Sequence, residues 1–249
     1  MTNPAGAGDF LIVCEHASKR IPASFGGLGL TAAALASHIA WDPGALAVAE
    51  TMFARLDATL VAQRFSRLLY DCNRPPDSPA SVPAVSEIYE IPGNTGLSAA
   101  DRQARADRFY LPFRRTLADC IERRVKSGRP PVIVTVHSFT PVYKGVRREV
   151  ELGILHDTDT RLADALLEGA GAGTDLVIRR NEPYGAADGV LHTLIEHGVS
   201  RGLLNVMLEI RNDLIADRAS QTEMAEWLSR RLTRALAALA VNPGGREIG

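Results

Sequence analysis

The chain has 249 residues, of which 46% are hydrophobic and 23% charged, and its 28 basic and 29 acidic residues give a formal net charge of −1. This near-neutral balance argues against nucleic acid or an anionic membrane surface as a partner. A chain of this length can bury one substantial core, and no linker divides it, so we predict a single domain over residues 1–249.

The N-terminal residues and the cysteines indicate where the protein works. The first eight residues lack the basic and apolar regions of a signal peptide, and no apolar run is long enough to span a bilayer. Cys14, Cys72 and Cys120 are odd in number and have no CxxC spacing, which is typical of reduced thiols. We therefore predict a cytoplasmic protein without membrane contact, for which the sequence leaves a homo-oligomer open.

Strand-like and helical patterns alternate along the chain. Apolar runs predict buried strands, and amphipathic segments with capping residues predict helices. In chain order these are strand Phe10–His16, helices Thr31–Ala40 and Pro43–Leu56, strand Ala58–Gln63, helix Ser98–Lys126, strands Pro131–His137 and Val150–Leu155, helix Thr160–Gly169, strand Asp175–Arg179, helix Asp188–His197, strand Leu203–Ile210 and helix Ser220–Val241. This alternation favours a three-layer α/β/α sandwich with a mixed, mostly parallel central sheet.

Two segments fall outside the alternation. Cys72–Gly96 contains five prolines, and a connection of this length without regular structure is usually functional or disordered. We predict an ordered surface excursion beside the functional site, and whether it acts as a lid stays open. Residues 242–249 are predicted to form a flexible tail.

Two histidines close apolar strands and are the strongest functional signal. His16 and His137 each end a predicted strand, and ligands bind in the crevice beyond the carboxyl ends of strands in open α/β sheets. Asp42 lies between two predicted helices. Two imidazoles and one carboxylate leave an open coordination position, as in catalytic zinc sites.

Other interpretations of these residues compete with the metal site. A single strand-end histidine is more often a hydrogen-bonded structural residue, and an aspartate before Pro-Gly is a good helix cap. Glu15 is an alternative ligand, although strand alternation points it away from the face of His16. His38, four residues before Asp42, is another candidate, but packing inside a helix is its more ordinary role.

Further charged residues follow two of the predicted strands. Glu209 ends an apolar strand, and a carboxylate beside a metal could take a proton from water and pass it to a leaving amine. The competing interpretation is an ion pair with Arg211, which strand alternation places on the same face. Arg64, Arg67 and Arg74 leave a strand for a loop and suit bidentate carboxylate recognition, with a solvated loop as the alternative.

Several short motifs, taken together, resemble the N-formylglutamate amidohydrolase family from about Leu11 to Leu239. They occur in the family's order: Glu15-His16-Ala17-Ser18, Trp41-Asp42-Pro43-Gly44-Ala45, Ser66 to Pro75, His137-Ser138-Phe139, Asn181 to Gly185, and Leu208-Glu209-Ile210-Arg211. The segment Asp71 to Arg74 also resembles the substrate-carboxylate motif of aspartoacylases and zinc carboxypeptidases, which are distant relatives. The resemblance implies their phosphorylase/hydrolase-like fold.

The resemblance also implies a role for each motif. His16, Asp42 and His137 would bind one zinc ion. The glutamate ligand of the carboxypeptidases is replaced here by Lys19, so Asp42 is the family-matched choice. The remaining roles are catalytic or substrate-binding: Glu209 as general base, Arg67 as oxyanion stabiliser, Asn73 and Arg74 for the α-carboxylate, Arg211 for a second carboxylate, and Asn181 and Tyr184 in the pocket wall.

The implied substrate is a small N-acyl, and within this family N-formyl, acidic amino acid. Typical members read Pro-His-Ser-Gly where this chain has Glu15 to Ser18, and glycine-glycine where it has Ala186-Ala187. They read Glu-x-x-Arg where this chain has Glu209-Ile210-Arg211. A metallopeptidase or deacylase for a different amide is therefore the alternative enzyme. A non-catalytic module that binds acidic metabolites is the alternative from another class.

Overall fold

A six-stranded sheet organises the computed structural model, which describes residues 1–169 and 174–241. The strand order is β2-β1-β5-β10-β8-β9, and all neighbours are parallel except β8 and β10. The strands are β1 Phe10–Cys14, β2 Thr59–Ala62, β5 Val132–Phe139, β8 Leu152–Leu155, β9 Ile178–Arg180 and β10 Asn205–Arg211. The predicted mixed, mostly parallel sheet is confirmed.

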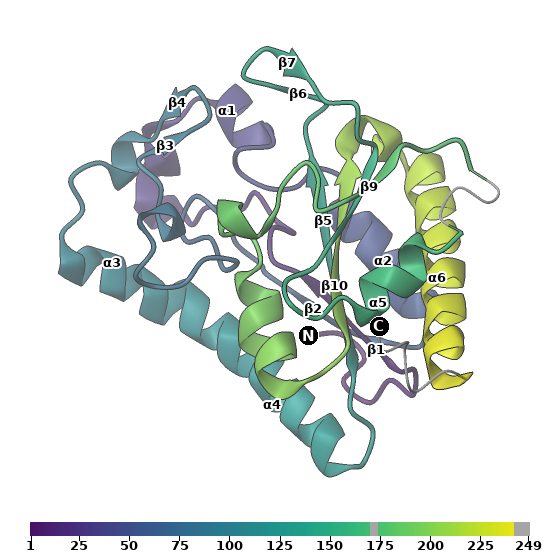
Figure 1. The fold of residues 1–249 in the computed structure, drawn as a ribbon. Coiled ribbons are helices and arrows are strands. Elements are labelled where there is room, and N and C mark those ends of the chain that lie inside the picture. The colour runs from purple at the N-terminus through teal and green to yellow at the C-terminus, as the bar shows by residue number, and fades with distance from the viewer. Residues whose placement is uncertain (170–173, 242–249) are drawn as a thin grey trace.

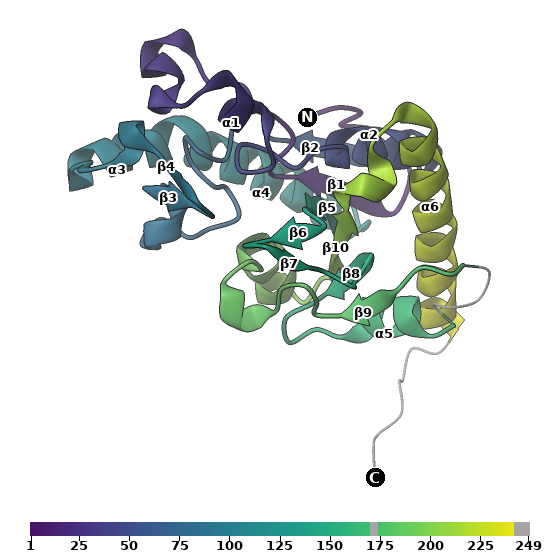
Figure 2. The ribbon, with the colours of Figure 1, turned by 90° about the horizontal axis from the view of Figure 1, so that it is seen from above.

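Helices cover both faces of this sheet (Figures 1 and 2). One face packs against α2 Ala45–Arg55, α5 Arg161–Leu167 and α6 Arg218–Val241, and the other against α4 Leu111–Lys126 and the turns over Leu194–Arg201. Strand alternation divides the side chains between the two cores, so Ile12 faces the first group of helices and Leu11 faces the second. Each fully buried aliphatic side chain contributes about 1.5–3 kcal/mol, which holds the three layers together.

The helices depart from the sequence patterns in three places. The helix predicted over Asp188–His197 is replaced by a 3₁₀ turn, Ala186–Asp188, and a π-helical turn, Leu194–Gly198. Ser98 accepts a hydrogen bond from the Asp101 amide at 3.1 Å and forms the capping box that begins α3, Ala99–Arg105. A π-helical turn over Ala106–Tyr110 separates α3 from α4 within the single predicted helix. The helix predicted over Thr31–Ala40 ends early, as α1 Ala32–Ala36, because the Ser37 hydroxyl and amide both donate to the Ala34 carbonyl.

Asn94 anchors the proline-rich segment, Cys72–Gly96. The Asn94 side chain is buried and donates to the carbonyls of Leu68 at 2.9 Å and Pro83 at 2.8 Å, while its oxygen accepts from Arg105. The segment forms a small hairpin of β3 Val85–Ser86 and β4 Tyr89–Glu90.

A second hairpin, of β6 Val142–Tyr143 and β7 Val146–Arg147, was not predicted because two-residue strands carry no periodicity. Its turn residues Lys144 and Gly145 both have positive φ, at 48° and 78°. This is the backbone that a tight hairpin turn requires, so the Lys-Gly pair was the available signal.

The remaining expectations concern the membrane, the cysteines and the tail. No helix within the two described ranges combines the length and the apolar character needed to cross a bilayer. The three cysteines are free and buried, and a cytoplasmic location stays a prediction. The predicted tail, 242–249, lies outside the described residues.

Burial of His197 makes stability depend on pH. Burial, together with the charge on Arg201, lowers the pKa of His197 to about 4, whereas an unfolded histidine titrates near 6.5. Between these values the unfolded chain binds a proton that the folded chain does not. The free energy of unfolding should therefore fall by up to about 1.4 kcal/mol per pH unit on acidification from roughly 6.5 to 4.

Denaturant unfolding of the wild type and of His197→Gln at several pH values tests this expectation. Other groups titrate equally in both proteins, so the difference between their pH slopes isolates the imidazole. Parallel slopes would contradict the assignment.

Candidate metal centre and pocket

Three segments deliver the metal-ligand candidates to one point. His16 lies just beyond β1, and its carbonyl accepts a hydrogen bond from the Asp42 amide at 3.0 Å. His137 lies within β5, the strand beside β1, because β5 runs two residues further than predicted. Gly44 turns the chain from Asp42 into α2 with φ of 81°, where a Cβ atom would lie 2.5 Å from the Ile215 carbonyl oxygen. Local backbone structure therefore fixes all three positions.

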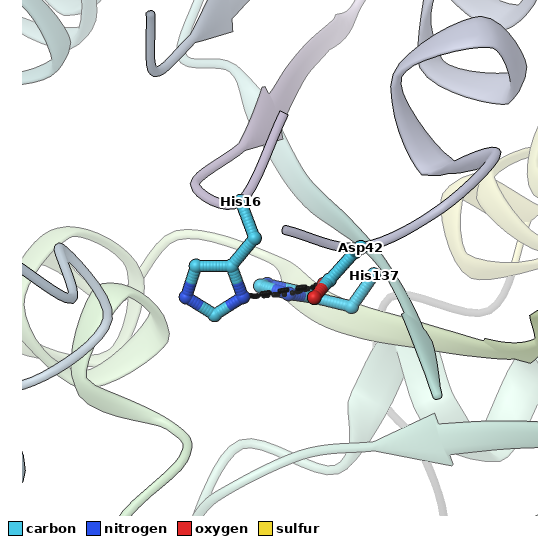
Figure 3. A group of neighbouring side chains, drawn as sticks. All are labelled: His16, Asp42 and His137. Atoms are coloured by element: carbon cyan, nitrogen blue, oxygen red, sulfur yellow. Dashed lines mark hydrogen bonds and ion pairs between the residues drawn. The ribbon is translucent and has the colours of Figure 1, made fainter. Parts of the chain in front are cut away.

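The three side chains converge as predicted (Figure 3). Asp42 Oδ2 lies 2.8 Å from His137 Nδ1 and 3.2 Å from His16 Nδ1, and the two Nδ1 atoms are 3.2 Å apart. All three residues are buried, with exposed fractions of 2–3%. They form a group whose ligand atoms all lie within 4.8 Å of one another.

The outer nitrogens of both imidazoles face carboxylates. His16 Nε2 lies 2.7 Å from Asp71 Oδ1, and an ionised carboxylate only accepts, so Nε2 carries the proton. His137 Nε2 lies 3.1 Å from Glu15 Oε2, a contact close in distance but poorly aligned as a hydrogen bond. Protons on these nitrogens leave both Nδ1 atoms as acceptors. Carboxylates behind metal-binding histidines fix this tautomer in many metal sites.

This donor set fits a divalent cation. Two Nδ1 lone pairs and one carboxylate oxygen, Asp42 Oδ2, point at each other inside the protein. Within the described ranges, the Ser138 amide donates to Oδ2 at 3.3 Å, and Arg67 donates to the other carboxylate oxygen, Oδ1. Converging acceptors repel unless a proton or cation lies between them. The ligand types, two imidazoles and one carboxylate, are those of catalytic zinc centres.

The two alternative ligands lie outside this group. Glu15 projects to the same sheet face as Leu11 and Val13, and it reaches His137 from the side opposite Asp42. His38 pairs instead with Glu87, at 2.8 Å between His38 Nε2 and Glu87 Oε2.

Arg67 balances the negative charge around the group. Its guanidinium lies 2.6 Å from Asp71 Oδ2 and 3.4 Å from Asp42 Oδ1. Burial alone would raise the pKa of Asp42, but the imidazoles of His16 and His137 outweigh it and lower this pKa. Burial would likewise lower the pKa of His137, but Glu15 and Asp42 raise it. Each of these carboxylates therefore lies next to an imidazole or to the Arg67 guanidinium.

Glu209 has a different environment from the other acids. It pairs in register with His137 across the parallel strands β10 and β5, so both side chains project to one face. Its Oε2 atom is buried without a hydrogen-bond partner among the described residues. Burial, reinforced by the charge on Asp42, raises the pKa of Glu209 to about 7. A carboxyl group with this pKa can exchange a proton near neutral pH.

The alternative interpretation of Glu209, an ion pair with Arg211, is wrong. Arg211 stands at the end of β10, and its guanidinium contacts Glu151 at 3.0 Å and Asp213 at 2.8 Å. The Arg211 guanidinium therefore donates to Glu151 and Asp213, and not to Glu209 as strand alternation had suggested.

A small pocket opens above the group. Its volume is about 190 Å³, below the range of roughly 300–1,000 Å³ that is usual for drug-sized ligands. The residues that line it come from the strand ends, the proline-rich segment and both hairpins: His16, His38, Ile39, Asp42, Arg67, Asn73, Arg74, Ser86, Glu87, His137, Ser138, Tyr143, Tyr184, Val190 and Glu209. The pocket therefore suits a small polar metabolite.

The predicted substrate-binding residues divide into two groups. Arg74 and Tyr184 line the pocket, as does Asn73, whose side chain is already bonded to the backbone of Val190 and Thr193. Arg211 and Asn181 do not line it. Asn181 accepts a hydrogen bond from the His156 amide at 2.9 Å.

Sequence reasoning assigned no role to several residues that now border the site. Asp71 stood inside the recognised Asp-x-Asn-Arg segment, which was a usable signal. Ser86, Glu87 and Tyr143 lie on short hairpins that leave no periodic trace.

A family model described as N-formylglutamate amidohydrolase matches residues 8–216. The chain belongs to this family. Its members are hydrolases that act on an amide bond, and we describe the chain as an amidohydrolase from here on. No curated protein matches it.

Solved structures that are similar to this amidohydrolase include the following two. The gene product Atu2144 from Agrobacterium tumefaciens is 56% identical, with a TM-score of 0.94 over 96% of this chain and 94% of that chain. An N-formylglutamate amidohydrolase from Ralstonia eutropha is 20% identical, with a TM-score of 0.56 over 97% of this chain and 96% of that chain. The second likeness shows a shared fold.

The geometry predicts that Asp71 supports metal binding without being a ligand. Asp71→Asn should weaken zinc binding by roughly 10- to 100-fold, because it removes the carboxylate that holds the His16 tautomer. His137→Ala should abolish stoichiometric binding. Competition with a chromophoric chelator measures both affinities.

His38→Gln is the matched control, because His38 lines the same pocket but lies outside the converging group. Its zinc affinity should equal that of the wild type. Tight stoichiometric binding by His137→Ala would refute the centre.

Proposed function

We propose that this amidohydrolase is metal-dependent and cleaves a small N-acyl acidic amino acid, with N-formylglutamate giving formate and glutamate as the specific reaction. The observation that carries the proposal is the convergence of two imidazole nitrogens and a carboxylate oxygen beside Glu209, whose pKa is about 7. Membership of the N-formylglutamate amidohydrolase family supports the choice of amide.

Zinc is the proposed ion, with His16, Asp42 and His137 as its ligands. When bound, such an ion acidifies water and polarises a carbonyl group. The contribution of this chain's own residues to metal binding is preorganisation. Asp71 holds the His16 tautomer through a hydrogen bond, Glu15 lies 3.1 Å from His137 Nε2, and the Asp42 amide donates to the His16 carbonyl.

Glu209 is the proposed general base. Its carboxylate takes the proton from the attacking water and then delivers it to the nitrogen of the leaving amine, so the residue ends the cycle as it began. A pKa near 7 allows both transfers at neutral pH, because neither protonation state is strongly favoured. Its place beside His137 on the sheet keeps it within the pocket.

Arg67 is the proposed oxyanion stabiliser. Asp42 and Asp71 occupy two of its five N–H donors, which leaves three for the substrate. The two acids also prevent the guanidinium from reorienting when charge develops on the carbonyl oxygen. Fixed donors of this kind typically account for a rate factor of about 10²–10³.

The α-carboxylate of the substrate is assigned to Arg74, in the pocket wall. Asn73 accepts from the Arg74 guanidinium through its backbone carbonyl at 3.0 Å, so it positions this arginine in addition to bonding the Val190 to Thr193 backbone. Tyr184 completes the wall. A carboxylate bound away from the scissile amide supplies orientation to the reaction.

A substrate panel with metal control tests the proposal. The purified protein should release formate from N-formylglutamate, lose this activity on chelation and regain it with zinc. N-acetylglutamate and a glutamyl dipeptide are the comparison substrates. Turnover of only these would indicate a deacylase or metallopeptidase, and ligand binding that ignores chelators without any turnover would indicate a binding module.

Removal of the Glu209 carboxylate should separate chemistry from metal binding. Glu209→Ala should lower kcat by about 10²–10⁴ while zinc content stays stoichiometric, because the proton acceptor is lost and the metal ligands remain. Steady-state kinetics with metal analysis provide the measurement.

Glu149→Gln is the control, because Glu149 is an exposed carboxylate outside the pocket. It should retain wild-type kcat. An unchanged kcat in Glu209→Ala would exclude Glu209 as the base.

A further inference from the structure

Two arginines near the pocket are already neutralised. Arg67 contacts Asp42 and Asp71, and Arg211 contacts Glu151 and Asp213. A guanidinium held by two carboxylates already has its charge balanced, so neither arginine needs a substrate carboxylate as its counter-ion, although Arg67 keeps free N–H donors for a carbonyl oxygen. Arg211, to which the family resemblance gave a second substrate carboxylate, is therefore already paired with two acids of the protein.

Arg148 differs from both. It follows the β6–β7 hairpin, which lies above the carboxyl end of β5 in Figures 1 and 2. Its Nη1 atom donates to the Tyr184 hydroxyl at 3.0 Å and approaches the Thr140 carbonyl at 3.4 Å. Within residues 1–169 and 174–241, no carboxylate lies within ion-pair distance of Arg148.

Aromatic rings surround the Arg148 guanidinium. Its central carbon lies 4.6 Å from the centre of the Tyr143 ring, 4.8 Å from that of Tyr184 and 5.4 Å from that of Phe139. Tyr143 and Tyr184 both line the pocket, and Arg148, which is not itself a lining residue, lies directly behind these two side chains. Stacked rings hold the planar group in place and displace water from its faces, while its N–H edge stays able to bind an anion.

Such a group lacks its counter-ion. A half-buried guanidinium costs free energy unless an opposite charge pairs with it, and a carboxylate matches its fork of donors. Arg74 is the other pocket arginine without an acid partner in the described ranges, and it is assigned to the α-carboxylate. One unpaired guanidinium in the pocket lining, and a second one directly behind two of the lining tyrosines, match a substrate with two carboxylates.

We propose that Arg148 binds the side-chain carboxylate of the substrate and makes the enzyme selective for dicarboxylic N-acyl amino acids. Tyr143 and Tyr184 are positioning residues that hold its guanidinium. This inference rests on the proposed hydrolysis of an N-acyl amino acid. It places the selectivity on the β6–β7 hairpin and the segment after it, away from the metal centre.

The test compares two substrates of nearly equal shape, N-formylglutamate and N-formylglutamine. The wild type should prefer the dicarboxylate. Arg148→Gln should raise KM for N-formylglutamate by roughly 10- to 100-fold, the usual effect of losing a charge-assisted hydrogen-bonded pair. Its KM for N-formylglutamine and its kcat for both substrates should stay within about threefold of the wild type, because no partner charge is lost there.

Arg147→Gln is the matched control, since Arg147 is the exposed neighbour in β7. It should keep the wild-type preference, and zinc content and melting temperature confirm that each variant is folded. Equal losses on both substrates in Arg148→Gln would reduce Arg148 to a structural role and overturn the proposal. The proposal would also be overturned if Arg148→Gln kept the preference for N-formylglutamate over N-formylglutamine, or if Arg211→Gln lost it.

Binding of glutarate separates this inference from the proposed reaction. Titration calorimetry should give the wild type a lower Kd for glutarate than for its monoamide, and Arg148→Gln should remove the difference. If this holds but the wild type hydrolyses no N-acyl amino acid, the reaction is wrong and the anion site stands. If hydrolysis occurs and Arg148→Gln binds glutarate as the wild type does, the inference alone fails.

Discussion

Three hydrogen-bond acceptors facing one another in a buried space form the constraint on which the site depends. The Nδ1 atoms of His16 and His137 and the Asp42 carboxylate lie about 3 Å apart, an arrangement that only a cation or a proton can make favourable. The fold creates it because β1 and β5 are parallel neighbours, so their carboxyl ends meet at one edge.

The charges around this point are arranged so that neighbouring acids have different tasks. Asp71 and Glu15 each contact an imidazole, and ion pairing keeps them ionised against the effect of burial. Glu209 is equally buried but has no ion-pair partner among the described residues, so burial raises its pKa to about 7. The different surroundings thus keep Asp71 and Glu15 ionised, whereas Glu209 can carry a proton near neutral pH.

The walls of the pocket come from a different part of the architecture. The metal-ligand candidates and Glu209 lie on or next to central strands, whereas Glu87 and Tyr143 lie on the two small hairpins. Glu87 also joins the two hairpins, because it accepts a hydrogen bond from the Lys144 amide at 3.1 Å, and it pairs with His38 in the segment before α2. The catalytic candidates thus lie on or beside the rigid sheet, and part of the pocket wall comes from connecting segments. Loop residues can change without disturbing the sheet, so this arrangement allows one scaffold to bind different substrates.

Local patterns in the sequence were sufficient for the layers of the fold and for the main chemical groups. Apolar runs that end in His16, His137 and Glu209 predicted both the strands and the edge where these side chains meet, because parallel strands present their ends together. Only the tertiary structure decided the partners of each charge. Glu15 lies behind His137, Arg211 is held by Glu151 and Asp213, and Arg148 is left to the aromatic rings. Pairing of this kind depends on contacts between residues far apart in the chain, and periodicity carries no information about such contacts.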